Sequence, residues 1–348
     1  MRCKPLKCLL GSEMKLTALV PQRSLWDTVL PNLVMLGSAI AAFLGIIFLL
    51  FVLAERSPNK IQNILKYVVF LAPAAVLLLI GLIYPAIRTL IYSFMNDDSS
   101  KFIGFENYVW AFTIPEIRIV LRNTLIWTIL VPVLATGTGL AIAYMTDRMK
   151  RAAVIKSLIF MPMAISFVGA GIIWRFVYTY EANLKRPEIG LLSSIWRAME
   201  WEPRNWLLEA PLNTLLLIVV MVWIQTGFAM VVLSAAMKNI PDEIIEASLL
   251  DGTSNWRRFT KITIPMIRAT IVVVLTTITI GTLKVFDIVR TMTGGNFKTN
   301  VIANEMYSQS FRQMNYGTGS ALAIILFIAI IPIIIYNVRQ LRLERTER

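Results

Sequence analysis

Long apolar stretches recur along this chain and are separated by short polar segments. Each apolar stretch reaches the roughly 20 residues that a helix needs to cross about 30 Å of hydrocarbon. Only helices and closed barrels satisfy their backbone hydrogen bonds inside a bilayer, and stretches this long indicate helices. We therefore predict an all-α polytopic membrane protein with about seven spans, at about 29–54, 67–94, 121–145, 153–178, 212–236, 266–289 and 318–338.

Composition agrees with this pattern. The 348 residues are 57% hydrophobic and only 16% charged, whereas soluble domains carry about 25% charged residues. The net charge of +13 comes from cations that flank apolar stretches, so we interpret it as a topology signal and not as nucleic-acid binding. The chain has no histidine, and its two cysteines, Cys3 and Cys8, lie in the N-terminal tail. No metal cluster, disulfide framework or catalytic nucleophile–base set is suggested.

The positive loops predict the orientation. Lys and Arg gather at 55–66, 146–157, 237–269 and 337–348, and alternating spans place these four segments on one side. Positive loops stay in the cytoplasm, so we expect a cytoplasmic C-terminus in the plasma membrane. The N-terminus would then lie outside, although the first 27 residues carry five Lys and Arg. Either the downstream loops dominate, or the first apolar stretch is not a simple span.

A polar connector at residues 239–265, called the elbow below, interrupts the apolar pattern. Pro241 and the acids Asp242 and Glu243 are typical of a helix start. Gly252 is typical of a helix end, where a left-handed residue is often needed. Ser254 is a plausible cap for a second short helix reaching about Ile262. The sequence thus predicts a helix–glycine–helix elbow whose Ile and Leu side chains need a partner to cover them.

The elbow resembles the EAA loop of ABC importer permeases, E-A-A-x-x-x-G-x(9)-I-x-L-P. Glu246, Ala247, Gly252, Ile262 and Pro265 match this motif, while Ser248 replaces the second alanine and Ile264 the leucine. The resemblance implies that the elbow docks into a separate ATP-hydrolysing subunit. The coupling residues would be Glu246, Ala247, Ser248, Asp251, Gly252, Ile262 and Pro265, with Glu246 meeting a basic residue of that subunit.

The chain itself lacks the phosphate-binding motif G-x-x-x-x-G-K-[ST], because no Gly-Lys pair occurs in it. We therefore expect a transport subunit that is no enzyme and holds no cofactor, with ATP and Mg²⁺ bound by partner subunits. The resemblance implies an ATPase dimer, a second homologous permease and an extracytoplasmic solute-binding protein. It also implies a bacterial inner-membrane type I importer bundle at 65–348, preceded at 1–64 by a tail and an extra span.

Other motifs resemble carbohydrate permeases. They are Asn123-Thr124, Met161-Pro162 with Trp174, and Phe286-Asp287 followed by Thr293-Gly294-Gly295. The segment NVIANEMYSQSF with YGTGSALA most resembles alpha-glucoside permeases, a group that includes systems for maltose-like sugars, sucrose, trehalose and glucosylglycerol. The resemblance implies import of such a sugar or glycoside by alternating access.

Candidate sugar-binding residues lie on the fifth and sixth spans. Gln225 and Phe228 offer an amide and an aromatic face at mid-span, where a polar side chain is costly unless it faces a cavity or a partner helix. Thr282 and Phe286 are spaced to share one helix face with Thr279. The alternative is that the threonines bond back to their own helix and the aromatic side chains pack between helices.

Competing interpretations stay open. The same machine could carry a non-sugar osmolyte or a polyamine, and a proton- or sodium-driven carrier would use charged groups such as Lys284 and Asp287. A local ion pair between those two residues is the simpler expectation. Trp196, Trp201 and Trp206 on the outer side would anchor at the membrane interface or form a docking surface. The elbow favours the ATP-driven machine, because a secondary carrier has no ATPase to dock.

Overall fold

The computed structural model describes residues 25–55, 59–147, 149–182 and 189–346. The tail cysteines Cys3 and Cys8 and the cations of residues 1–24 lie outside the described residues. Most of the described residues are helical and no β-strand is formed among them, as predicted for an all-α protein. The described residues divide into two units, one up to Pro85 and the other from Ala86.

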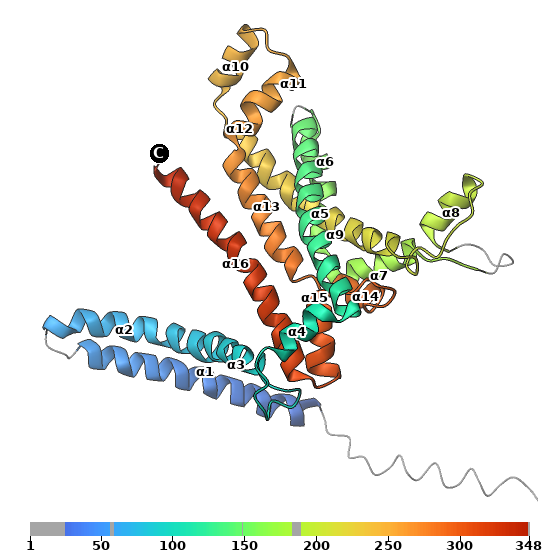
Figure 1. The fold of residues 1–348 in the computed structure, drawn as a ribbon. Helices are drawn as coiled ribbons and strands as arrows, with labels where there is room; N and C mark the ends of the chain where they lie inside the picture. The colour runs from blue at the N-terminus through green and yellow to red at the C-terminus, as the bar shows by residue number, and fades with distance from the viewer. Residues whose placement is uncertain (1–24, 56–58, 148, 183–188, 347–348) are drawn as a thin grey trace, which may run out of the picture. The chain divides into compact units, whose positions relative to one another are not determined.

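The first unit holds two long helices that lie side by side (Figure 1). Helix α1 covers Leu25–Glu55, and α2 covers Asn59–Leu78 before a π-helical turn at Leu79–Ile83 leads into α3 at Tyr84–Tyr92. Most of the described apolar side chains here are exposed; Met35, for example, is 72% exposed. Side chains of this kind suit a hydrocarbon environment.

The second unit is a bundle built around α5 and α9. Its helices are α4 (Glu106–Thr113), α5 (Pro115–Thr146), α6 (Ala152–Phe160), α7 (Phe167–Val177), α8 (Leu191–Ala198), α9 (Leu212–Lys238), α10 (Asp242–Leu250), α11 (Asn255–Arg258), α12 (Ile264–Met266), α13 (Arg268–Leu283), α14 (Asp287–Met292), α15 (Ile302–Tyr307) and α16 (Tyr316–Thr346). Of the described helices, five are long and apolar enough to span a membrane, and two bent helix pairs raise the count to seven if each pair is one span.

The bends correct the predicted spans. The stretch 153–178 is not one straight helix, because α6 and α7 meet at 102°. Pro162 lies in a 3₁₀ turn between them, and its missing N–H and its ring disfavour a continuous α-helix there. The stretch 266–289 is also divided, because α13 ends at Leu283 and α14 begins at Asp287.

Helices α5 and α9 approach closely because small residues lie between them. A Cβ added at Gly139 would lie 2.6 Å from the Ala229 Cβ and 2.8 Å from the Met230 amide nitrogen. Small residues let transmembrane helices pack backbone to backbone. The hydroxyls of Thr138 and Thr226 add a 2.9 Å hydrogen bond across the same pair of helices.

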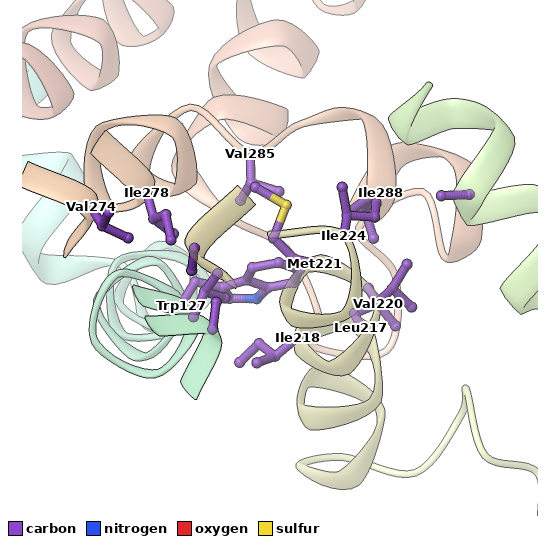
Figure 2. Packing of buried hydrophobic residues seen from close by; sticks show 14 of the residues in the cluster. Trp127, Leu217, Ile218, Val220, Met221, Ile224, Val274, Ile278, Val285 and Ile288 are labelled. Atoms are coloured by element: carbon purple, nitrogen blue, oxygen red, sulfur yellow. The ribbon is translucent and has the colours of Figure 1, made fainter. Parts of the chain in front are cut away.

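The apolar core surrounds Trp127 on α5. Its side chain is fully buried and lies among Ile218, Met221 and Ile278 (Figure 2). Helix α16 joins the bundle through Asn337, whose amide donates to the Thr276 hydroxyl at 2.6 Å. These contacts join α5, α9, α13 and α16 in one bundle.

The tryptophans of segment 189–211 pack on one another. The Trp196 ring centroid lies 5.1 Å from that of Trp201 and 5.0 Å from that of Trp206. Trp206 is buried and donates to the Ser193 hydroxyl at 2.8 Å. Trp206 belongs to the main apolar core and Trp196 packs against it, so this aromatic cluster anchors the segment to the bundle.

Candidate functional site

The elbow has the helix–glycine–helix form that its sequence predicts, but the second helix is an α-helix only over Asn255–Arg258 and continues as a π-helical turn at Phe259–Thr263. Helix α10 begins at Asp242 after Pro241, and Gly252 follows its end with a left-handed φ of +67°. The Ser254 hydroxyl caps α11 by accepting the Arg257 amide at 3.3 Å. In Figure 1 the elbow lies at one end of α13, and α14 and α15 lie at the other.

The outer face of α10 carries charged and apolar side chains together. Glu246, Ala247, Asp251 and Gly252 are exposed. Leu249 is 54% exposed and Leu250 90%. An exposed apolar surface bordered by charges is typical of a protein–protein contact.

The other three predicted coupling residues differ from one another in how far they are buried. Ser248 is buried and its hydroxyl donates to the Ile245 carbonyl at 2.6 Å. Its own carbonyl accepts the Thr253 amide at 3.2 Å. Ile262 is half-buried, whereas Pro265 is exposed at the entrance to α13. Ser248 therefore stabilises the turn from inside while Glu246 faces outward.

The elbow is attached to the end of α5. The rings of Tyr144 and Phe259 lie 4.2 Å apart between centroids, and the Tyr144 hydroxyl donates to the Asn255 carbonyl at 3.2 Å. Buried Arg258 donates through Nη2 to the Asn255 side chain at 2.7 Å. A force on the elbow would therefore reach α5 through these contacts as well as α13 through the chain.

The predicted mid-span residues Gln225 and Phe228 are half-buried on α9. A Cβ at Gly281 would lie 3.8 Å from Gln225 Nε2, so the amide lies beside α13. Within the described residues no hydrogen bond of this amide is found. Two residues before Gln225, Trp223 packs edge to face with Trp174, with centroids 5.6 Å apart.

Thr282 and Phe286 do not share a helix face, which corrects the prediction. Helix α13 ends between them, and Phe286 precedes α14 with its ring 5.1 Å from that of Tyr307. Thr282 is fully buried and donates to the Ile278 carbonyl at 2.7 Å, and Thr279 donates to Leu275. In this conformation both hydroxyls form hydrogen bonds within their own helix.

The expected ion pair between Lys284 and Asp287 is wrong. In the part of the chain that the structure describes, salt bridges join Lys156 to Asp147 at 3.2 Å and Arg204 to Glu209 at 3.8 Å, and neither Lys284 nor Asp287 has one. Lys284 ends α13 and Asp287 begins α14. The i, i+3 spacing brings side chains together only along a continuous helix.

A loop at the other end of the bundle, residues 293–300, is held by two asparagines. Asn123 was noted only as part of a motif, with no role, and Asn213 was missed in the sequence. Asn123 on α5 donates to the Lys298 carbonyl at 2.7 Å and the Asn300 carbonyl at 3.0 Å. Asn213 on α9 donates to the Phe297 carbonyl at 2.8 Å. We call these contacts the asparagine clamp.

The clamp holds an unusual backbone. Gly294, Gly295, Phe297 and Lys298 all have left-handed φ values, between 54° and 87°. Such a conformation is disfavoured for a residue with a Cβ and persists where surrounding contacts enforce it. A signal was present in the sequence, since Asn-Thr-Leu occurs at 123–125 and again at 213–215.

Comparison with known proteins identifies the family. Residues 135–346 match the model of the binding-protein-dependent transport system inner membrane component. The chain is 45% identical over 279 residues to the osmoprotective compounds uptake permease protein GgtC of Synechocystis sp., covering 80% of this chain and 100% of the relative. It is also 45% identical over 282 residues to the alpha-glucoside transport system permease protein AglF of Rhizobium meliloti, covering 81% and 84%.

Among solved structures, a chain of the bacterial alginate ABC transporter, in complex with an alginate pentasaccharide-bound periplasmic protein, gives a TM-score of 0.70 at 20% identity. The match covers 80% of this chain and 94% of that chain, and it confirms the fold of an ABC importer bundle. The chain belongs to the binding-protein-dependent transport system inner membrane component family. It is a permease subunit and not an enzyme; in this family the ATPase is a separate subunit.

Proposed function

We propose that the chain is one permease subunit of an ATP-driven importer that takes up a neutral oligosaccharide or glycoside by alternating access. The alpha-glucoside, sucrose, trehalose and glucosylglycerol type of cargo fits best, because relatives named for alpha-glucosides and osmoprotective compounds share 45% identity with it. The observation that carries the ATP-driven part is the exposed face of α10, which presents Glu246, Leu249 and Leu250.

The energy enters through the elbow. A separate ATPase dimer would bind ATP and Mg²⁺ and grip α10, with Glu246 meeting a basic side chain in its cleft. Charge-assisted contacts of this kind are about twice as strong as neutral ones. Closure of the dimer would displace the elbow, and the contacts of Tyr144 with Asn255 and Phe259 would carry that displacement to α5.

The cargo would pass beside the mid-span part of α9. The Gln225 amide can both donate to and accept from sugar hydroxyls, and it lies half-buried next to Gly281. Phe228 is half-buried on the same helix and offers an apolar ring for the apolar face of a sugar. Thr282 would contribute only if its helix rearranged in another state, because its hydroxyl bonds to Ile278 here.

A direct test reconstitutes the whole importer. The chain would be co-purified with its ATPase subunits, the second permease and the binding protein, and then placed in lipid vesicles. Sugar-loaded binding protein is expected to stimulate ATP hydrolysis and accumulation of labelled glycoside. Uptake that continues without ATP and follows an imposed ion gradient would overturn the proposal in favour of a secondary carrier.

The relative named for osmoprotective compounds favours a second candidate cargo, a non-sugar osmolyte. A panel of glucosides, disaccharides, glycosylglycerols and betaine-type osmolytes, offered to the binding protein, separates the two. Tight binding of a glycoside with no binding of the charged osmolytes supports the sugar assignment. The reverse result assigns the osmolyte.

A further inference from the structure

A cavity with a positive lining opens where α7, α14 and the clamped loop meet. Its volume is about 450 Å³. Arg175 from the last turn of α7 and Arg290 from the last turn of α14 both line it. Neutral polar side chains complete its lining, among them Asn205, Thr291, Thr293 and Asn296.

The two arginines have no counter-ion. Among the described residues no carboxylate lines this cavity, and neither guanidinium forms an ion pair. Arg290 lies over the Tyr307 ring, 5.2 Å from its centroid, which orients the side chain but leaves its charge uncompensated. Two like charges beside one cavity attract an anion, and the planar fork of a guanidinium matches a carboxylate.

Hydrogen bonds from the asparagine clamp hold the wall of the cavity in place. The Asn213 amide donates to the carbonyls of Phe297 and Leu207, at 2.8 Å and 3.3 Å, and both of these residues line the cavity. Asn123 holds the next part of the loop. A site that is already ordered loses less conformational entropy when a ligand binds.

The position of the cavity in the bundle indicates whether its anion belongs to the cargo or to another protein. Helix α14 lies at the opposite end of α13 from the elbow, so the cavity faces outward if the elbow faces the cytoplasm. The cargo of the proposed function is a neutral glycoside and would not need two positive charges. The other component of such an importer that reaches the outer face is the soluble binding protein.

We propose that this cavity is a docking socket in which Arg175 and Arg290 hold a carboxylate side chain of the extracytoplasmic binding protein. This inference rests on the proposed function. A carboxylate held between exposed Arg175 and half-buried Arg290 would fix the register of the binding protein on the permease. It would also make docking sensitive to salt.

The first experiment removes the charges. The double variant Arg175→Gln with Arg290→Gln, in the complete importer held in lipid nanodiscs, is expected to weaken binding of the binding protein at least tenfold. The salt dependence of that binding should fall as well. Arg312→Gln, which removes an exposed charge elsewhere in the unit, is the matched control and should change neither. ATP hydrolysis without binding protein should stay at the wild-type rate in all variants, which shows that they fold and assemble.

The second experiment identifies the partner group. Arg290→Lys keeps the charge and supplies an amine that a carbodiimide can couple to a nearby carboxylate. We expect a cross-link from position 290 to one Asp or Glu of the binding protein, identified by mass spectrometry, and no such cross-link from Arg312→Lys.

Two outcomes overturn the socket while leaving the proposed function intact. One is unchanged affinity and salt dependence in the double Gln variant of an importer that still takes up glycoside. The other is protection of the position 290 amine by a free acidic saccharide that the importer also transports, which would assign the cavity to an anionic cargo. If the wild-type importer does not bind a binding protein at all, the proposed function itself fails.

Discussion

Asn123 and Asn213 belong to different helices, yet their side-chain amides donate to backbone carbonyls of the same loop, at Lys298 and Phe297, with distances of 2.7 Å and 2.8 Å. Each asparagine is followed by Thr and Leu. The Thr124 hydroxyl extends the pattern by accepting the Ile302 amide at 2.9 Å. The central helix pair thus determines the shape of the loop that follows α14.

Removing one asparagine of the asparagine clamp should destabilise the loop 293–300 and the cavity that this loop lines. Asn213 is fully buried, and Asn213→Ala leaves the carbonyls of Phe297 and Leu207 without their donor. The expected loss is about 1–3 kcal/mol, measured as a lower apparent melting temperature in detergent.

Asn123→Ala should have a similar effect, and the double variant should lose less than the sum, because both amides hold one loop. Asn239→Ala changes an exposed asparagine and is expected to leave the melting temperature unaltered. Strictly additive losses would show that the two contacts act independently.

The close approach of α5 and α9 predicts a strong difference between two neighbouring glycines. Gly139→Ala places a methyl group 2.6 Å from the Ala229 Cβ and 2.8 Å from the Met230 nitrogen, so the helices must separate. Overpacking of this kind costs about 1–3 kcal/mol, and the assembled complex should melt earlier.

Gly137→Ala is the matched control for that variant. Nothing lies within 4 Å of a Cβ there, and alanine favours a helix over glycine by up to about 1 kcal/mol in soluble hosts. Equal melting temperatures for the two variants would contradict the packing of α5 on α9.

Charge reversal at Glu246 should weaken attachment of the ATPase. Glu246 is exposed on α10 beside Leu249 and Leu250. If it meets a basic side chain of the ATPase, Glu246→Lys places two positive charges against each other. Co-purification of the ATPase subunits should fall while the chain still inserts into the membrane. Glu243→Lys, the same change on the same helix outside the motif, should retain more of the ATPase.

The left-handed turn at Gly252 should be equally important. Its φ of +67° is incompatible with proline, whose ring holds φ near −65°, so Gly252→Pro should disrupt the turn and reduce ATPase co-purification. Gly252→Ala is expected to have a milder effect, of about 1–2 kcal/mol. Normal complex yield for Gly252→Pro would count against the docking role of the elbow.

Gln225 should affect transport without affecting assembly. Gln225→Leu removes an amide that has no hydrogen-bond partner among the described residues, so it should be tolerated structurally. If that amide binds the sugar, glycoside uptake should fall roughly tenfold, the effect of losing about 1.4 kcal/mol.

Thr277→Val serves as the control for transport. Thr277 is exposed on α13 and donates to the Val273 carbonyl of its own helix, so uptake should be preserved. Normal uptake by Gln225→Leu would exclude this amide from the cargo path.

Much of the fold follows from local sequence. Hydropathy alone locates the apolar stretches. Pro241, Gly252 and Ser254 predict where the helices of the elbow begin and end. Each of these residues acts through its own φ angle or through atoms within three residues, and this is why the predicted helix starts, turn and cap agree with the structure.

Only the tertiary structure reveals the features that depend on contacts between distant parts of the chain. The sequence could not place Phe286 off the face of Thr282, turn α7 by 102° from α6, or bury Ser248 while Glu246 stays exposed. Nor could it join Asn123 to Lys298, 175 positions away. Periodicity assumes a continuous helix and carries no information about which element covers a face. Hydropathy and caps are properties of a few neighbouring residues, whereas a clamp, a bend or a cavity exists only once remote segments pack together.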